Sequence, residues 1–171
     1  EKPPPPALVA ALSAHIPPRR LDLVRASLTD FSPLMALGPA VEVLNLAHNP
    51  GLSALPEDLS ALASLRILFL LGCSFTALPR GLATAPALTM ISFKSNRIEA
   101  WDEGVLGDGV EWLILTDNRI PSIPADVGRL TRLRKCMLAC NSITEVPASM
   151  ASCTSLELIR LSSNRIRCRG R

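Results

Sequence analysis

VEWLILTDNRIPSIPADVGRL, residues 110–130, sets out the pattern that decides the fold: alternating apolar residues, then an asparagine, a proline and further spaced apolar residues. The first half of this pattern recurs at spacings of 24, 23, 22, 23 and 23 residues. The copies are VEVLNLAHNPGL from residue 41, LRILFLLGCSF from 65, LTMISFKSNRI from 88, VEWLILTDNRI from 110, LRKCMLACNSI from 133 and LELIRLSSNRI from 156. A weaker copy, PRRLDLVRASL, begins at residue 18. A fixed period of this length indicates an array of stacked structural units.

The alternation within each unit predicts a strand. Positions 4 and 6, counted from the first residue of a unit, carry large apolar side chains, such as Leu44 and Leu46 or Leu113 and Leu115. Successive side chains of a strand point to opposite faces, so these two positions point inward together. The sequence therefore predicts a parallel sheet with one strand per unit and with positions 3 and 5 on its outer face.

Position 9 of each unit predicts a ladder of buried amide side chains that hydrogen-bond the backbone of neighbouring turns. The ladder residues are Asn49, Asn96, Asn118, Asn141 and Asn164, with Cys73 at the same position. Because a thiol is a weaker donor than an amide, we expect a local weak point at the cysteine without loss of the turn.

The second half of each unit predicts an irregular or 3₁₀ return segment. Four units have a proline at position 15, or at position 16 in the 24-residue unit, and proline has no backbone N–H to give to a helix. These prolines are Pro56, Pro79, Pro124 and Pro147. The unit from residue 88 instead reads WDEGVLGDG at this point, which predicts a distorted loop between Trp101 and Gly109.

The repeats resemble leucine-rich repeats of the 23-residue LPxxLxxL class, which includes Ras-associated scaffolds and plant disease-resistance-like proteins. The resemblance implies an α/β solenoid: a curved right-handed array with a parallel β-sheet on the concave face and an irregular or 3₁₀ convex side. Residues 18–171 would form this domain, with about seven repeats and the last one incomplete. Residues 1–17 would be a proline-rich capping segment with a short helix over residues 6–15, because the ends of repeat arrays need covering.

A narrower resemblance concerns the phrases VLNLAHN, MISFKSNRI, WLILTDNRI and LELIRLSSNRI. They are similar to the N-terminal repeat segment of proteins in which leucine-rich repeats precede a protein kinase domain. The glycine-rich loop, the VAIK-type lysine strand, HRD and DFG are absent from the sequence, so no kinase chemistry carries over to this chain.

An apolar band is predicted on the outer face of the sheet, where each position forms a column across the strands. The band consists of Val43, Ile67, Phe69, Met90, Trp112, Ile114 and Met137. Its rim would be Lys94, Asp117, Lys135 and Arg160. Exposed apolar patches rimmed by polar groups usually mark interaction sites, so the sequence predicts a binding surface for a protein partner of unknown identity. Two alternatives remain: a C-terminal domain of the same polypeptide covers the band, or the residues merely suit a strand.

Position 2 predicts a column of alternating charge. It reads Arg19, Glu42, Arg66, Thr89, Glu111, Arg134 and Glu157. Opposite charges on adjacent strands suggest structural ion pairs. A nucleic-acid groove would need one sign of charge, and the net charge is only +3, so we expect no nucleic-acid partner.

Catalytic, metal and cofactor sites are not expected. His15 and His48 have no nucleophile that the repeat places beside them. Cys136 and Cys140 occupy positions 4 and 8, one inward and one outward, and therefore do not converge on a zinc ion. No phosphate-binding loop is present.

The composition predicts a soluble cytoplasmic chain. Hydrophobic residues make up 48% of it, but no apolar run approaches the roughly 20 residues that span a bilayer. The start lacks the basic and apolar regions of a secretory signal. The small net charge of +3 gives no strong reason to expect an anionic membrane, so we expect no membrane partner. Five cysteines, an odd number, and the absence of Asn-x-Ser/Thr favour a reducing compartment.

Overall fold

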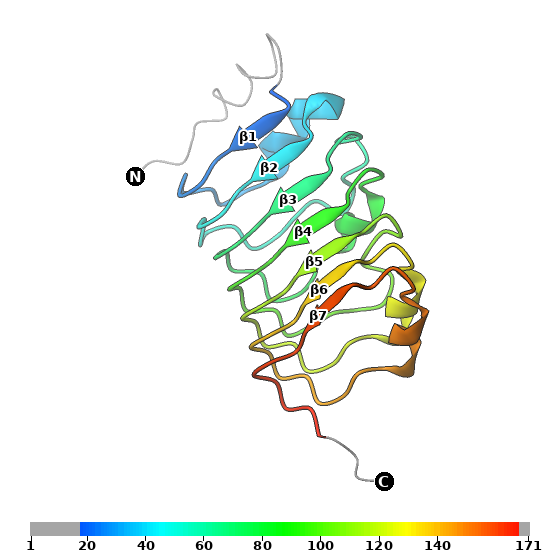
Figure 1. The fold of residues 1–171 in the computed structure, drawn as a ribbon. Coiled ribbons are helices and arrows are strands. Elements are labelled where there is room, and N and C mark those ends of the chain that lie inside the picture. The colour runs from blue at the N-terminus through cyan, green and yellow to red at the C-terminus, as the bar shows by residue number, and fades with distance from the viewer. Residues whose placement is uncertain (1–17, 168–171) are drawn as a thin grey trace.

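Seven short strands, one from each unit, lie side by side in chain order and form a single parallel sheet (Figure 1). The strands are β1 (Arg20–Asp22), β2 (Val43–Asn45), β3 (Ile67–Phe69), β4 (Met90–Ser92), β5 (Trp112–Ile114), β6 (Lys135–Met137) and β7 (Leu158–Arg160). The computed structural model describes residues 18–167. The capping segment expected at residues 1–17 lies outside the described residues.

The register of the sheet places equal positions of successive units next to one another. Val43 pairs with Ile67, Ile67 with Met90, and Met90 with Trp112. Units of 24 and 22 residues keep the same register, because their insertion and deletion fall outside the strands. The weak first copy is a true unit, since Arg20 pairs with Val43. The predicted solenoid with one strand per unit is confirmed.

The core lies behind the sheet and is built from the inward positions. Leu44, Leu46, Leu113 and Leu115 are fully buried, as the alternation predicts. Burial of such side chains stabilises a fold by about 1.5–3 kcal/mol each before the entropy of ordering the chain is subtracted. The core therefore runs without interruption along the array.

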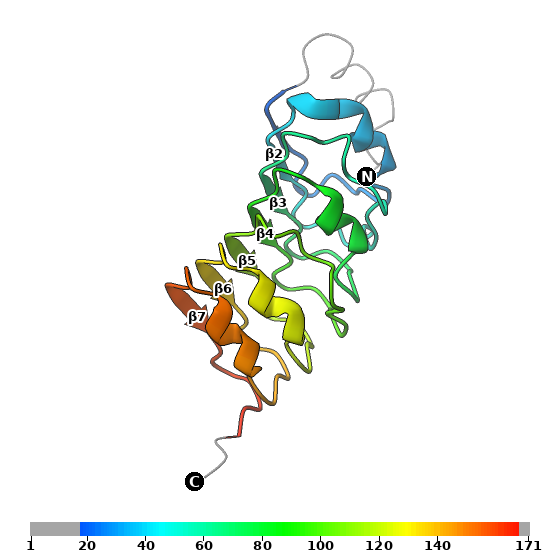
Figure 2. The ribbon, with the colours of Figure 1, turned by 90° about the vertical axis from the view of Figure 1, so that its right-hand side faces the viewer.

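The convex side carries short 3₁₀ helices, and no α-helix occurs among the described residues. The helices are η1 (Ser32–Ala40), η2 (Arg80–Thr84), η3 (Ala125–Arg129) and η4 (Ala148–Ser152). Each of η2, η3 and η4 is preceded directly by a proline in an extended conformation: Pro79, Pro124 and Pro147. Proline suits this place because its φ is fixed and it has no backbone N–H to donate. Figure 2 shows the helices on one side of the array and the sheet on the other, gently concave side. The irregular or 3₁₀ convex side is confirmed.

The unit from residue 88 has no helix in its return segment. Trp101 is buried there, and Gly104 adopts a φ of 74°. The loop is held by the next unit: the Gly104 N–H donates to the Asp126 carboxylate at 2.7 Å, and Arg129 pairs with Asp108. Arg129 also donates to the carbonyl oxygen of Leu106 at 3.1 Å. The loop is thus distorted, as predicted, but well anchored.

The asparagine ladder is present behind the strand ends. The Asn118 side-chain oxygen accepts a hydrogen bond from the Ile98 N–H at 2.9 Å, and its NH₂ donates to the carbonyl oxygens of Phe93 at 2.9 Å and Leu115 at 3.0 Å. The Leu115 carbonyl oxygen also accepts from Asn141 at 2.9 Å. Side chains of consecutive units therefore share acceptors, and the turns are tied together along the array.

Cys73 interrupts this ladder without leaving a backbone donor unpaired. Its thiol is 3.5 Å from the carbonyl oxygen of Leu46, which is a weak contact for sulfur. The Leu52 N–H, which would face an asparagine oxygen in a regular unit, donates to the Asn49 carbonyl oxygen at 2.9 Å instead. The extra residue of this 24-residue unit permits that local turn.

Position 8 shows a regularity that the sequence pattern does not reveal. In every unit this residue has a left-handed φ, between 53° and 65°. The residues are Arg25, His48, Gly72, Ser95, Asp117, Cys140 and Ser163. Non-glycine residues rarely adopt this conformation. In the first six units the position-8 N–H donates to the next unit, as Asp117 does to the Ala139 carbonyl oxygen at 2.9 Å, which supports the turn.

Among the described residues, no helix is long and apolar enough to cross a bilayer.

Candidate partner-binding surface

The outer face of the sheet brings four predicted band residues into one row. Val43, Ile67, Met90 and Trp112 occupy position 3 of consecutive units, and the strand register places them side by side. Each side chain is half-buried, whereas the intervening position-4 side chains are fully buried. Since adjacent strands lie about 4.8 Å apart, the row extends over about 15 Å.

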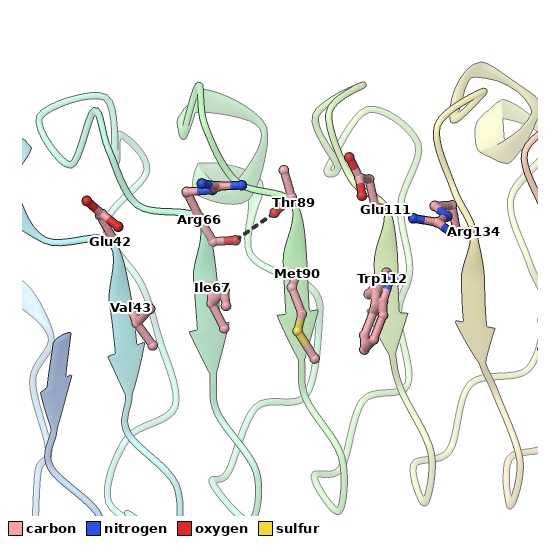
Figure 3. Close-up of a pocket in the computed structure, with 9 residues that line it drawn as sticks. All are labelled: Glu42, Val43, Arg66, Ile67, Thr89, Met90, Glu111, Trp112 and Arg134. Atoms are coloured by element: carbon pink, nitrogen blue, oxygen red, sulfur yellow. Dashed lines mark hydrogen bonds between the residues drawn. The ribbon is translucent and has the colours of Figure 1, made fainter. Parts of the chain in front are cut away.

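This row forms the apolar side of an open hollow of about 350 Å³ (Figure 3). The other side is formed by the position-2 side chains of the same strands and their neighbour. The lining residues are Glu42, Val43, Arg66, Ile67, Thr89, Met90, Glu111, Trp112 and Arg134. The hollow is therefore apolar along one edge and charged along the other.

Trp112 has a cationic neighbour on the far side of the hollow. The Lys135 ammonium nitrogen lies 3.8 Å from the centre of the indole ring. Such a cation–π contact contributes about 0.5–1 kcal/mol at an exposed site. It therefore favours the observed position of the indole ring. The sequence placed Lys135 on the rim of the band, and the structure places it directly against the Trp112 ring.

The position-5 residues of the band are more scattered. Ser92 is buried and separates Phe69 from Ile114 in this column. Phe69 lines a second hollow of about 450 Å³ with Val24, Arg25, Asn45, Ala47, His48, Leu71 and Ser92. Ile114 and Met137 pair with each other across β5 and β6 but line neither hollow. The structure thus gathers four band residues at one hollow and Phe69 at another.

The remaining rim residues lie around this face without joining either hollow. Lys94, Asp117 and Arg160 are exposed. Lys94 and Asp117 follow the ends of β4 and β5, and Arg160 ends β7, four strands away from Ile67. Their side chains could meet a large partner, but they do not converge on one point.

The charge column at position 2 is confirmed at its two ends and interrupted in the middle. Arg19 and Glu42 form an ion pair at 3.0 Å, and Arg134 and Glu157 form one at 2.7 Å. Arg66 has no ion pair within residues 18–167: Thr89 stands at the same position on one neighbouring strand, and Glu42 on the other pairs with Arg19. The Thr89 hydroxyl donates to the Arg66 carbonyl oxygen at 3.2 Å instead.

Five lining residues were not predicted from the sequence: Glu42, Arg66, Thr89, Glu111 and Arg134. Their column predicts ion pairs between strands and not a binding surface. Position 2 precedes position 3, and side chains at the start of a short strand lean over the same face (Figure 3). The signal that could have found them was the single uncharged residue in an otherwise charged column.

The residues examined for catalysis or metal binding stay apart. Within the described part of the chain, no three His, Cys, Asp or Glu side chains come together in a way that could hold a metal ion. Cys136 is buried and Cys140 is exposed, so they face different environments. His48 is exposed beside Gly72, and His15 lies outside the described residues.

Comparison with known proteins agrees with this geometry. Residues 108–166 match the family described as leucine rich repeat. The fold is similar to that of a leucine-rich repeat protein of Leptospira interrogans, with 29% sequence identity and a TM-score of 0.79. The likeness covers 85% of this chain and 37% of that one, so this chain spans well under half the length of its structural neighbour. No curated protein matches the sequence. The chain therefore folds as a leucine-rich repeat solenoid.

Proposed function

We propose that this chain is a protein-interaction module that binds a partner protein through the apolar band on its concave face. The observation that carries the proposal is the row of Val43, Ile67, Met90 and Trp112 along one open hollow. Contiguous apolar side chains that stay partly open to water on one face often mark a binding site. Trp and Met are also enriched at interfaces, and Trp is a frequent anchor of binding energy.

Among the described residues, the side chains considered for catalysis or metal binding stay apart. This fits the proposed role, but the proposal does not rest on it. Leucine-rich repeat proteins typically act as non-enzymatic interaction modules. The proposal therefore includes no enzymatic activity and no cofactor for this chain. The rim of the apolar band includes Lys94, Asp117, Lys135 and Arg160. These residues would orient a partner rather than provide most of the affinity.

The test is a comparison of binding by wild-type protein and a Trp112→Glu/Phe69→Ser variant. Both side chains point away from the core, so the variant should keep its melting temperature within a few degrees. We expect a protein retained from a lysate of the source organism by the wild type to be lost by the variant. The matched control is Val146→Glu, which adds the same charge at a residue 39% exposed that lines neither hollow.

Two results would count against the proposal. Equal retention by the wild type and the double variant would show that the band does not bind the captured protein. A large fall in the melting temperature of the double variant would show that these side chains support the fold rather than a partner.

A role in intracellular signalling or scaffolding in the cytoplasm is part of the proposal. It is supported by the resemblance to intracellular repeat proteins, by the lack of Asn-x-Ser/Thr sites and by the free state of Cys73, Cys136, Cys140 and Cys153. Fractionation of cells with an antibody against the chain would test the location.

A second candidate function is a regulatory or substrate-docking segment of a protein kinase. The short phrases shared with repeat segments that precede kinase domains favour it. In that case the band could be covered by a C-terminal domain of the same polypeptide. Reading the open reading frame past Arg171 separates the two candidates, since a kinase domain would show HRD and DFG there.

A further inference from the structure

The charged residues that line the hollow between β2 and β5 differ in whether they form an ion pair. Glu42 is already paired with Arg19 at 3.0 Å. Arg134 is held by Glu157 at 2.7 Å. Arg66 is the lining cation whose guanidinium has no hydrogen bond or ion pair to any described side chain. Of its neighbours on the adjacent strands, Glu42 already pairs with Arg19, and Thr89 is uncharged and donates its hydroxyl to the Arg66 carbonyl oxygen.

Glu111, the remaining lining carboxylate, lies within the influence of a cation. The pKa of the Arg134 guanidinium is raised first by its hydrogen bond with Glu157, then by the charge of Glu157, and further by the charge of Glu111. Glu111 therefore interacts with Arg134 without a direct ion pair. Glu111 and Arg66 are therefore the two lining charges that form no direct ion pair among the described residues, and Arg66 is the cation of the two.

A partner that covers this hollow would remove water from Arg66. A guanidinium that loses its water without gaining an acceptor incurs a penalty, and a charge-assisted hydrogen bond to a carboxylate removes that penalty. The apolar edge of the same hollow, formed by Ile67, Met90 and Trp112, would accept a large apolar side chain. Both requirements fall on one partner segment, because the two edges face the same open space (Figure 3).

The spacing of the strands limits how that segment carries its two groups. Arg66 precedes β3, and the gap between Met90 and Trp112 lies one to two strands further along the sheet. This separation is about 5–10 Å. In an extended segment, side chains on the same face are two residues and about 6.6 Å apart. A carboxylate and an apolar side chain at that spacing can reach both edges together.

We infer that the partner segment bound by this hollow is acidic and apolar: an extended stretch with an Asp or Glu that pairs with Arg66 and, two residues away, a large apolar side chain seated between Met90 and Trp112. This inference rests on the proposed function, since it requires the concave face to bind a protein. It adds the charge of the partner group that faces Arg66 and the spacing of the two anchor residues.

The experiment is a selection of random seven-residue peptides, displayed on phage, against immobilised wild-type protein. We expect the enriched sequences to contain Asp or Glu two positions from Leu, Ile, Phe or Trp. The same library is selected against Arg66→Glu and against Arg97→Glu. Arg97 is exposed, lies outside the lining of the hollow and forms no ion pair among residues 18–167, which makes it the matched control.

The affinity of one enriched peptide and its Asp/Glu→Lys counterpart is then measured by fluorescence anisotropy. The acidic peptide should bind Arg66→Glu and Arg66→Gln at least about tenfold more weakly than the wild type, as expected for loss of a charged hydrogen bond. The lysine peptide should prefer Arg66→Glu to the wild type. Arg97→Glu should bind as the wild type does. Melting temperatures establish that each variant is folded.

Three other results would each overturn the inference. Peptides that need Trp112 but show no acidic residue and no response to Arg66→Glu would overturn this inference and leave the proposed function standing. Peptides that bind the Trp112→Glu/Phe69→Ser variant as well as the wild type would overturn both. A library that yields no sequence bound by the wild type and lost by Trp112→Glu would also overturn the inference, because a short segment would then not suffice.

Discussion

One asparagine in five of the seven repeats provides hydrogen bonds that the turn after the strand cannot obtain from the backbone. Asn118 satisfies the Ile98 N–H and the Phe93 carbonyl oxygen in the preceding unit and the Leu115 carbonyl oxygen in its own. Loss of such a side chain leaves polar groups without partners inside the protein, which costs more than the net value of a single hydrogen bond.

We expect Asn118→Ala to lower the free energy of unfolding by about 1–3 kcal/mol. Cys73→Ala should lower it less, because the thiol makes one weak contact and the Leu52 N–H already has a backbone acceptor. Denaturant unfolding of both variants, followed by circular dichroism, measures the difference. Equal losses would show that the position-9 side chain acts by filling space and not through its hydrogen bonds.

The cysteines differ in reactivity according to their burial. Burial raises the pKa of the Cys136 thiol to about 12, with a smaller contribution from the nearby Cys153. Because this pKa is raised, the thiol's contribution to stability is complete below the unfolded value of about 8.5 and is lost as the pH rises towards 12. Cys140 is exposed at the left-handed position 8.

Iodoacetamide at pH 8 should therefore modify Cys140 rapidly and leave Cys136 untouched in the folded chain, since the thiolate is the reactive form. Tandem mass spectrometry of the digested protein locates the modified residues. Denaturant before alkylation is the control and should expose both thiols equally. Modification of Cys136 at the rate of Cys140 in the native protein would reveal frequent opening of the sixth unit.

At the scale of single elements, the return segments stack closely enough to restrict side chains. A Cβ atom on Gly81, in η2, would overlap the carbonyl oxygen of Pro56 in the preceding unit. Gly107, in the loop of the next unit, would bring a Cβ no closer than 3.7 Å to the Ala83 carbonyl oxygen. The two glycines are thus similar in the sequence and different in their surroundings.

Gly81→Ala should lower the free energy of unfolding by about 1–3 kcal/mol, because the backbone of one of two stacked units must shift to admit the methyl group. Gly107→Ala should change it by less than about 0.5 kcal/mol, as for an ordinary contact near the surface. Thermal unfolding of the two variants beside the wild type gives both values. A neutral Gly81→Ala would mean that the convex segments can slide past one another.

The strands and their register were predictable at this scale. They depend on the alternation of side chains along a strand and on a repeat of almost constant length. Leu44 and Leu113 had to point inward, and Val43, Ile67 and Trp112 had to align. The helices were less predictable: Pro79 precedes one and Pro56 does not, although both follow the same pattern. The unpaired charge at the edge of the hollow was not predictable in the same way. It depends on which neighbours of Arg66 already form ion pairs, and the repeat spacing alone does not determine how side chains pair.

At the scale of the whole molecule, the array is held together by contacts between neighbouring units. The strands contact one another in chain order, and η3 packs on η4. In such a quasi-one-dimensional protein, stability is the sum of each unit's own contribution and the interfaces it makes. A unit with one interface should therefore open more easily than a unit with two.

The seventh unit has one such interface among the described residues, and its apolar positions Leu156, Ile159 and Leu161 are only half-buried. In the fourth unit, Ile91 and Phe93 are fully buried. We expect backbone amides of residues 156–161 to exchange with deuterium markedly faster than those of residues 88–93, because opening the end unit exposes less apolar surface. Hydrogen exchange followed by mass spectrometry compares the two segments in one experiment.

Two variants separate an opening end from uniform unfolding. Ile159→Ala should accelerate exchange only near the seventh unit, since its interface with the sixth is the one that weakens. Ile91→Ala should accelerate exchange over the central units, because the cavity left at a fully buried site costs about 2–5 kcal/mol and is shared by interfaces on both sides. Equal exchange rates along the wild-type chain, and an equal response to both variants, would contradict the nearest-neighbour account. The array would then unfold as one cooperative unit, and the concave band would be rigid over its whole length.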